Sequence, residues 1–343
     1  MRSRLRLAGD LEWQRCFSGQ KRVTAIPANN TASYRFCARQ SQGARDYQED
    51  DYGFLDAREN DGEPEHTLLA VADGMGGHAN GARASAIAAE AFIDAYQHSG
   101  EATVKRLEGA LHHANQRVAR AIADEPALAG MGTTLVGVVI RQERLNWVSV
   151  GDSPLWLFRQ GHLAQLNADH SMAPLLQQMV VDGRISAEEA ASDPKRNSLL
   201  SAVMGHDIEL IDLPSEPLAC QTGDLVIIGS DGLQTLSDAE IQTIVAGHSQ
   251  DSAMKISEAL IRAVDAKAKP GQDNVTVLVY RPTVGHDVRQ SGSAASIAEA
   301  DERPKQSTGT SGIGLKQLGI ITLGLLAVVA LVYLLSLSMT TGQ

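Results

Sequence analysis

Four apolar runs of the chain each have an aspartate at one end. Three of them end at Asp73, Asp152 and Asp231, and the fourth begins just after Asp273. The runs are rich in β-branched residues, which favours strands. Because the strands of one sheet bring their ends together, we expect these carboxylates to be neighbours, and a bound cation would relieve their repulsion. A single aspartate after a strand is usually only a turn residue. The prediction of a metal site therefore rests on the whole set, which an acidic cluster at 49–51 extends.

The order of the predicted elements favours an α+β fold with antiparallel sheets. Apolar residues at helical spacing predict helices at 80–97, 104–124, 238–246 and 252–267. Strand-like runs lie at 33–39, 66–73, 133–141, 145–152, 155–160, 224–231 and 274–281. Two helices thus come early, strands follow, and two helices come late, without the βαβ alternation of a doubly wound sheet. Turns at 142–143 and 160–161 make 133–166 an antiparallel meander.

Composition divides the chain into four parts. Residues 1–32 are a basic N-terminal arm without an apolar run of signal-peptide length, and 33–281 form one domain. Residues 282–314 are polar and small, as in a flexible linker. Residues 318–337 carry no charge, and a run of 20 such residues is long enough for a transmembrane helix. Arg303, Lys305 and Lys316 precede this run. They predict a single-pass C-terminal anchor in the inner membrane, with the main domain in the cytoplasm.

The charge and the cysteines exclude several classes of protein. A formal net charge of −11 argues against a nucleic-acid partner. The three cysteines, Cys16, Cys37 and Cys220, fit neither a disulfide framework nor a zinc motif. Cys16 and Arg22 have the spacing of the loop of cysteine-dependent phosphatases, but no predicted strand and helix flank them as that loop requires. The sequence also contains no P-loop motif of nucleotide-hydrolysing proteins.

The candidate ligands of the predicted metal site are all oxygen donors, which suit Mg²⁺ or Mn²⁺. Two such ions about 4 Å apart can hold a phosphoryl group and generate a hydroxide nucleophile. Arg45, just before the acidic cluster, could bind the phosphate with both arms of its guanidinium group. The alternative for Arg45 is an ordinary surface arginine.

The same residues belong to an ordered set of short motifs. The motifs are GARDYQED (43–50), DGMGGH (73–78), GTT (132–134), GDS (151–153), DHS (169–171), GD (223–224), SDGL (230–233) and DNVT (273–276). In this order and at these separations, they resemble the metal-dependent serine/threonine protein phosphatases of the 2C type, in their bacterial form. The resemblance covers about 33–281.

The resemblance implies a β-sandwich of two antiparallel sheets flanked by helices, in α-β-β-α layers, and a centre of two Mn²⁺ or Mg²⁺ ions, or three. Asp73 would bridge two ions, the Gly74 carbonyl would ligate one of them, and Arg45 would bind the substrate phosphate. Asp152 and Asp231 would form a third metal site. The remaining implied ligands, direct or through water, are Asp50, Asp231 and Asp273, with Glu49 as a water-mediated supporter.

The chain departs from the family pattern at three positions. Gln48 replaces the usual Asn or Met, and Pro154 replaces an Arg that often follows Gly-Asp-Ser. Met75 occupies the place where animal members carry a histidine as a candidate general acid. Because Met75 cannot donate a proton, the acid must be a metal-bound water or another group. His78 is open to a catalytic or a structural role, and for His170 a structural role is the commoner one.

The family carries a mobile insertion, the flap, beside its site, and residues 171–207 match it in position. Either a phosphopeptide contact or a solvated helical insertion is compatible with its composition. The expected function is that of a signalling hydrolase: a protein phosphatase that removes phosphate from serine and threonine with a metal-activated water. Its expected partners are phosphorylated proteins, a serine/threonine kinase whose action it reverses, and the membrane. The alternative is an inactive phosphatase-like module that is tethered to the membrane and only binds.

Overall fold

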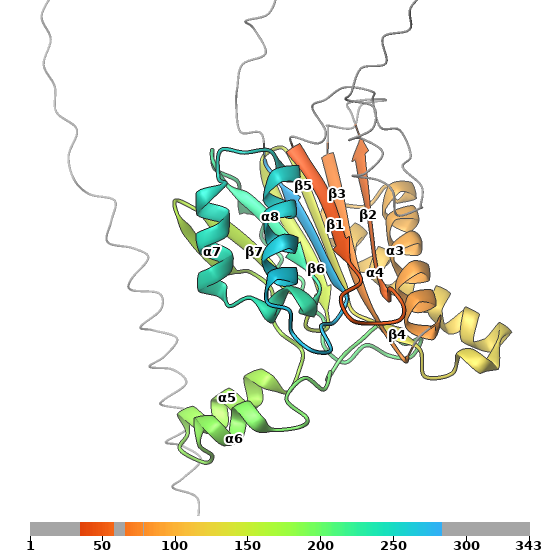
Figure 1. Ribbon diagram of the computed structural model, residues 1–343. Coiled ribbons are helices and arrows are strands. Elements are labelled where there is room, and N and C mark those ends of the chain that lie inside the picture. The colour runs from red at the N-terminus through yellow and green to blue at the C-terminus, as the bar shows by residue number, and fades with distance from the viewer. Residues whose placement is uncertain (1–34, 58–65, 78, 283–343) are drawn as a thin grey trace, which may run out of the picture. The chain divides into compact units, whose positions relative to one another are not determined.

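Two antiparallel sheets face each other in the computed structural model, which describes residues 35–57, 66–77 and 79–282 (Figure 1). Sheet A has the strand order β1-β11-β10-β7-β8, and sheet B has the order β2-β3-β5-β6-β9, with β4 paired to β3. The strands of sheet A are β1 (Phe36–Ser41), β7 (Leu155–Arg159), β8 (His162–Gln165), β10 (Leu225–Gly229) and β11 (Val275–Tyr280). Those of sheet B are β2 (Asp50–Ala57), β3 (His66–Met75), β4 (Gly132–Thr133), β5 (Leu135–Arg141), β6 (Arg144–Val150) and β9 (Leu218–Ala219).

The central strands are apolar at nearly every position because both of their faces are covered. In β3, Leu69 and Val71 belong to the apolar cluster between the two sheets, together with Val226 and Leu278 of sheet A. The alternate residues of the same strand, such as Leu68, belong to the cluster under the outer helices. This alternation follows from the two-residue period of a strand, and burial on both faces explains the continuous apolar runs in the sequence.

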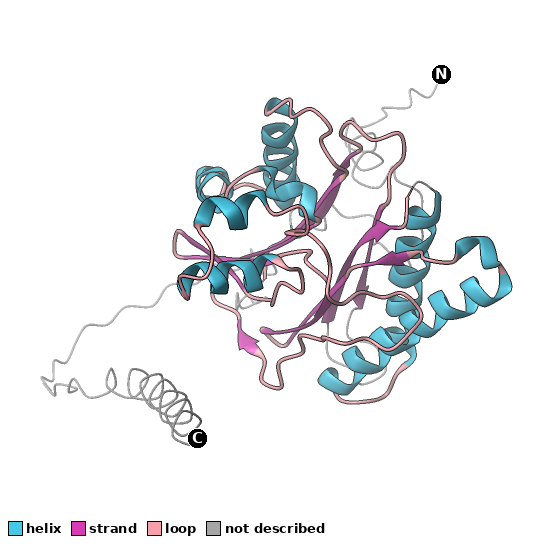
Figure 2. Cartoon of the chain, turned by 90° about the horizontal axis from the view of Figure 1, so that it is seen from below, coloured by secondary structure: helices cyan, strands magenta, loops and turns pink. Residues whose placement is uncertain are grey.

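Helices cover the outer face of each sheet, as Figure 2 shows from another side. Helices α3 (Ala79–His98) and α4 (Thr103–Asp124) pack on sheet B, and α7 (Asp238–Gly247) and α8 (Ala253–Ala266) pack on sheet A. Serine caps fix where the second pair begins: Ser237 makes a capping box with Glu240, and Ser252 accepts a hydrogen bond from the Lys255 N–H. The described residues also form the short helices α5 (Ala173–Val181) and α6 (Ala187–Ser192) and the 3-10 turns η1 (Pro126–Leu128) and η2 (Asp231–Thr235).

The predicted α-β-β-α sandwich is confirmed, and the four predicted helices differ from the observed ones by one residue or less at each end. Both predicted hairpin turns are also present: β5 and β6 pair with each other, as do β7 and β8. Gln142, Glu143 and Gln160 take positive φ angles there, which non-glycine residues adopt rarely. Strong pairing on both sides of the turns holds these residues in place.

Three predicted strands end or break earlier than expected, and the first is the run at 145–152, because β6 ends at Val150 and Asp152 lies beyond it. The run at 133–141 is divided, because Gly132 and Thr133 form β4 opposite Gly74 and Met75, while β5 begins only at Leu135. The run at 224–231 stops at Gly229, and Asp231 instead opens the 3-10 turn η2. The breaks at Thr134 and after Gly229 both lie at the end of the sandwich where the acidic side chains gather.

Three predictions concern residues that the structure does not describe. They are the basic arm at 1–32, nearly all of the linker at 282–314, and the transmembrane helix at 318–337. Within residues 35–57, 66–77 and 79–282, no helix is both long enough and apolar enough to span a bilayer. The anchor stays a prediction of the sequence.

Candidate metal centre

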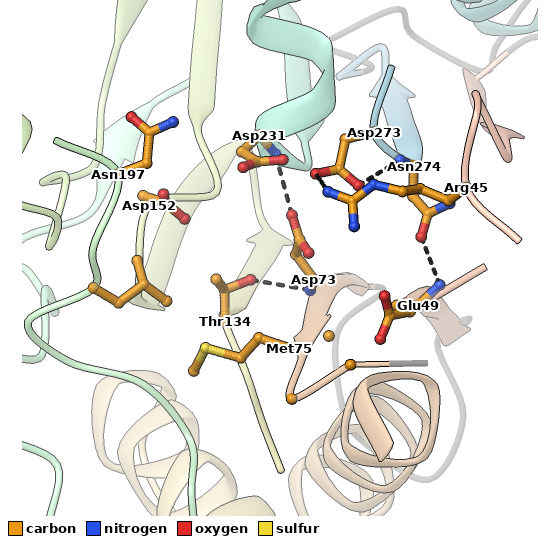
Figure 3. Close-up of a pocket in the computed structure, with 14 residues that line it drawn as sticks. Arg45, Glu49, Asp73, Met75, Thr134, Asp152, Asn197, Asp231, Asp273 and Asn274 are labelled. Atoms are coloured by element: carbon orange, nitrogen blue, oxygen red, sulfur yellow. Dashed lines mark hydrogen bonds and ion pairs between the residues drawn. The ribbon is translucent and has the colours of Figure 1, made fainter. Parts of the chain in front are cut away.

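A polar pocket lies at the end of the sandwich where strands of both sheets terminate (Figure 3). Its lining comes from seven separated parts of the chain. The lining residues are Arg45, Glu49, Asp73, Gly74, Met75, Gly76, Gly77, Thr134, Asp152, Asn197, Leu199, Asp231, Asp273 and Asn274. All the residues predicted for the site except Asp50 are among them. The pocket thus joins the strand-end aspartates with the one arginine singled out in the sequence.

Asp73 sits at the centre of the pocket and is held through its backbone. Its N–H donates to the Thr134 hydroxyl at 3.0 Å, and its carbonyl accepts from the Thr134 N–H at 2.9 Å and from the Thr133 hydroxyl at 2.9 Å. The Asp73 side chain reaches across to sheet A, where its Oδ2 accepts from the Asp231 N–H at 3.3 Å. These contacts leave the carboxylate pointing into the pocket (Figure 3).

Asp231 and Asp273 approach Asp73 from sheet A. Asp231 lies two residues after β10, and Asp273 lies two residues before β11, so the pairing of these two strands brings the residues together. Asp273 accepts a hydrogen bond from the Asn274 N–H at 2.8 Å. It also forms an ion pair with Arg45, whose Nη2 donates to Asp273 Oδ2 at 2.6 Å. The guanidinium group of Arg45 therefore lies at the rim of the pocket, about half exposed, with a carboxylate as its partner.

Asp50 lies behind the pocket, beside Asp73 on the neighbouring strand. Its side chain is almost fully buried and lies close enough to that of Asp73 for the two carboxyl groups to interact electrostatically. Glu49, next to it, does line the pocket, and its N–H donates to the Asn274 side chain at 2.8 Å. From this position, the carboxylate of Asp50 can act on an ion through a water molecule or through Asp73.

Burial and crowding raise the pKa of four carboxyl groups of the site. Burial is the main cause for Asp50, whose pKa is raised to about 6, and for Asp152, whose pKa is raised to about 7. Burial and the charges of Asp50, Asp231 and Asp152 raise the pKa of Asp73 well above its ordinary value. The pKa of Asp231 is also raised, by burial and by Asp273. The folded site thus favours positive charge, which protons or metal ions can supply.

The donor set fits a hard divalent cation. Every side-chain donor in it is oxygen, as Mg²⁺ and Mn²⁺ prefer. At Gly74 a Cβ would come within 2.4 Å of the backbone oxygens of Gly81 and Glu49, so only glycine fits between them. In the described part of the chain, no three side chains of Asp, Glu, His or Cys enclose an ion by themselves. The arrangement is that of an open site, in which water and backbone oxygens would complete the coordination.

Neither candidate histidine is shown to act as an acid. His170 is buried and does not line the pocket; its Nδ1 accepts from the Gly151 N–H at 3.3 Å, and burial lowers its pKa. These contacts tie the 167–171 loop to the end of β6, which is a structural role. His78 lies outside the described residues. Met75 lines the pocket without any acidic proton.

The flap lies beside the pocket and supplies two of its lining residues. The predicted insertion contains α5 and α6, and Asn197 and Leu199 follow them and line the pocket. Sequence reasoning did not single out these two residues, nor Asn274. Asn274 stands in the DNVT motif, whereas Asn197 and Leu199 stand in no motif and left no signal that could have identified them.

Comparisons with known proteins agree with this geometry. The model of the protein phosphatase 2C family matches residues 46–270. The serine/threonine protein phosphatase PstP of Mycobacterium tuberculosis is 36% identical over 256 residues, which are 74% of this chain and 46% of that protein. This chain thus matches about half the length of that relative. The serine/threonine phosphatase stp of Listeria monocytogenes is 32% identical over 259 residues, which are 74% of this chain and 95% of that protein.

A solved structure is also similar. The crystal structure of the catalytic domain of PstP in complex with two manganese ions aligns with a TM-score of 0.58 and 31% identity. The alignment covers 72% of this chain and 97% of that domain. The similarity therefore extends over nearly the whole of a domain that binds manganese.

The raised pKa values predict how pH affects the stability of the metal-free protein. A carboxyl group whose pKa is raised by folding contributes stability below its ordinary pKa of 3.8. That contribution is lost as the pH rises through about 7, the folded value for Asp152. Asp152→Asn should therefore stabilise the metal-free protein at pH 8 by on the order of 2 kcal/mol, since one pKa unit is worth ~1.4 kcal/mol.

Thermal unfolding in EDTA at pH 8 and pH 5 measures this effect. At pH 5 the advantage of Asp152→Asn should be far smaller, because the wild-type carboxyl is then protonated. Asp124→Asn, which removes an exposed carboxylate at the end of α4, serves as the control with little effect at either pH. Equal stability of Asp152→Asn and wild type at pH 8 would contradict the electrostatic description of the site.

Proposed function

The chain belongs to the protein phosphatase 2C family, and from this membership we propose that it hydrolyses phosphoserine and phosphothreonine in proteins at a Mn²⁺ or Mg²⁺ centre. The observation that carries the proposal is the convergence of carboxylates from both sheets on one pocket with Arg45 at its rim. A pocket of this composition would hold cations and, through them and Arg45, the dianion of a phosphate ester.

The proposed roles follow from where each residue lies. Asp73, at the centre, would contact two ions, and the carbonyl of Gly74 would contact one of them. Asp50 and Glu49 would support the centre from behind through water. The other carboxylates of the pocket that would hold ions are Asp152, Asp231 and Asp273, with Asp152 and Asp231 at a third site. Bound cations would neutralise the charge of the phosphoryl group and activate the attacking water.

Arg45 would bind the phosphate of the substrate. In the structure its guanidinium group pairs with Asp273 at 2.6 Å, which keeps the side chain at the rim of the pocket instead of free in solvent. A phosphate can accept two parallel hydrogen bonds from a guanidinium group, so it can replace this partner. The ion pair thus holds Arg45 near the position from which it would contact the substrate.

The leaving oxygen of serine or threonine needs a proton, and Met75 cannot supply it. We propose that this proton comes from a water molecule in the pocket, since the described lining contains no histidine. The inactive binding module, the alternative from the sequence, would be favoured by missing acidic residues. Asp50, Asp73, Asp152, Asp231 and Asp273 are all in place, which favours the enzyme.

Loss of a central carboxylate should abolish most of the activity. Asp73→Asn and Asp231→Asn should each lower kcat/KM by at least about 100-fold, because each removes negative charge from the proposed ion sites. The assay is hydrolysis of p-nitrophenyl phosphate and of a phosphothreonine peptide with Mn²⁺, with EDTA as the blank. Asp124→Asn is the matched control and should retain wild-type activity. Turnover that persists in EDTA, or in Asp73→Asn, would refute the metal mechanism.

Arg45→Ala should separate phosphate binding from metal binding. Loss of the charged hydrogen bonds to the phosphate should lower kcat/KM by about 10- to 100-fold. Mn²⁺ affinity, measured by calorimetry on the same variant, should not fall, because Asp273 loses a competing cation. Arg45→Lys should recover only part of the activity, since an ammonium group cannot make the bidentate contact. A loss of Mn²⁺ affinity in Arg45→Ala as large as the loss of activity would speak against this role.

The proposed partners are a serine/threonine kinase and the proteins it phosphorylates near the inner membrane. Support comes from the uncharged run at 318–337 and the preceding Arg303, Lys305 and Lys316, all outside the described residues. In a deletion strain, phosphoserine and phosphothreonine should accumulate on membrane-associated proteins, as measured by phosphoproteomics. Reintroducing the chain without 318–337 should restore less than the full chain does. The absence of any accumulation would argue against the kinase, and equal restoration would argue against the anchor.

A further inference from the structure

The buried carboxylate of Asp50 is held by two hydroxyl groups from the opposite sheet. Asp50 begins β2 in sheet B, whereas Thr276 lies on β11 and Ser230 follows β10 in sheet A. The Ser230 hydroxyl donates to Asp50 Oδ2 at 2.7 Å, and the Thr276 hydroxyl donates to the same oxygen at 2.7 Å. Both hydroxyl-bearing side chains are fully buried, so water does not compete for these contacts.

Further contacts fix the direction of these two hydrogen bonds. The Ser230 oxygen accepts from the Thr276 N–H at 2.9 Å, and the Thr276 hydroxyl oxygen accepts from Gln40 Nε2 at 3.0 Å. Because each hydroxyl has a single proton, both protons remain for Asp50. Gln40 also donates to the Asp50 carbonyl at 3.1 Å, so the backbone of that residue is held as well.

One oxygen of Asp50 is therefore occupied, and the other is left for the metal centre. Oδ2 accepts both hydroxyl hydrogen bonds, while the Asp50 side chain also contacts that of Asp73. Asp50 is only 6% exposed and does not line the pocket, so protein groups rather than solvent set its orientation. The two hydroxyl groups that hold Oδ2 are the side-chain donors that fix this carboxylate.

We propose that Ser230 and Thr276 are positioning residues of the metal centre: by holding Oδ2 of Asp50 from the opposite sheet, they present its Oδ1 to the cation site beside Asp73. This inference rests on the proposed function, because it concerns the same centre. Outer partners that orient ligands in this way commonly affect metal affinity by about 10- to 100-fold. The two residues would thus set how tightly the site binds its ions.

A purely structural role is the competing explanation, and the protein contains a matched example of it. At the other end of β2 and β3, the buried Thr67 hydroxyl donates to Asp56 Oδ1 at 2.9 Å. The chemistry is the same, a threonine hydroxyl on a carboxylate, but no residue of the metal pocket is involved. Thr67→Val therefore measures what the loss of such a contact costs in stability alone.

The test is calorimetric titration of Mn²⁺ into the metal-free full chain. Thr276→Val should weaken Mn²⁺ binding by at least about 10-fold, while Thr276→Ser, which keeps the hydroxyl, should bind nearly as wild type does. Thr67→Val should leave Mn²⁺ affinity unchanged even if its melting temperature falls. Ser230→Ala removes the second hydroxyl independently and should also weaken binding. If Thr276→Val does not unfold cooperatively in EDTA, Ser230→Ala carries the same test.

Two results would overturn the proposal. One is wild-type Mn²⁺ affinity in folded Thr276→Val or Ser230→Ala, and the other is a loss of affinity in Thr67→Val equal to that in Thr276→Val. Phosphatase activity of the wild type is measured separately. Wild-type protein that binds Mn²⁺ but hydrolyses no phosphopeptide would refute the proposed function and leave the positioning role standing, whereas active wild type with unaffected variants would refute the positioning role alone.

Discussion

The repulsion between carboxylates gathered at one end of the sandwich is the constraint on which the site depends. Asp50 and Asp73 lie opposite each other on β2 and β3, and Asp231 and Asp273 come to the same place from sheet A. Burial makes this crowding more costly and raises the pKa of most of these groups. Backbone donors, hydroxyl groups and Arg45 offset part of this electrostatic repulsion, and bound divalent cations would offset the rest. The same concentration of charge that strains the fold is what makes the pocket suitable for phosphate chemistry.

Much of the fold follows from local pattern. The helices were predictable because their apolar residues recur at helical spacing over about three to six turns, and two of them begin at serine caps. The strands were predictable as apolar runs, but not their ends. Thr134 and Asp231 were placed inside strands, because nothing local to them shows that β4 ends at Thr133 after pairing with β3 or that the chain forms a 3-10 turn after Gly229. Such breaks depend on tertiary contacts.

The site was predictable only where a motif marked it. Asp73, Asp152, Asp231 and Asp273 were recognised because each stands at the end of an apolar run, and all four line the pocket. The position of Asp50 behind the pocket could not be read from the sequence, because it depends on which face of β2 meets sheet A. Asn197 and Leu199 were missed for a different reason: they lie on an irregular segment after α6, which has no periodicity to interpret.

The two-sheet origin of the site has a consequence for how the protein folds and unfolds. Neither sheet alone carries a complete set of ligands, since Asp73 and Asp152 come from sheet B and Asp231 and Asp273 from sheet A. A partly folded chain with undocked sheets would bind cations weakly. Bound metal would therefore stabilise only the state in which the two sheets are docked. In the cell, the availability of divalent cations would set how large a fraction of the molecules keeps its two sheets together.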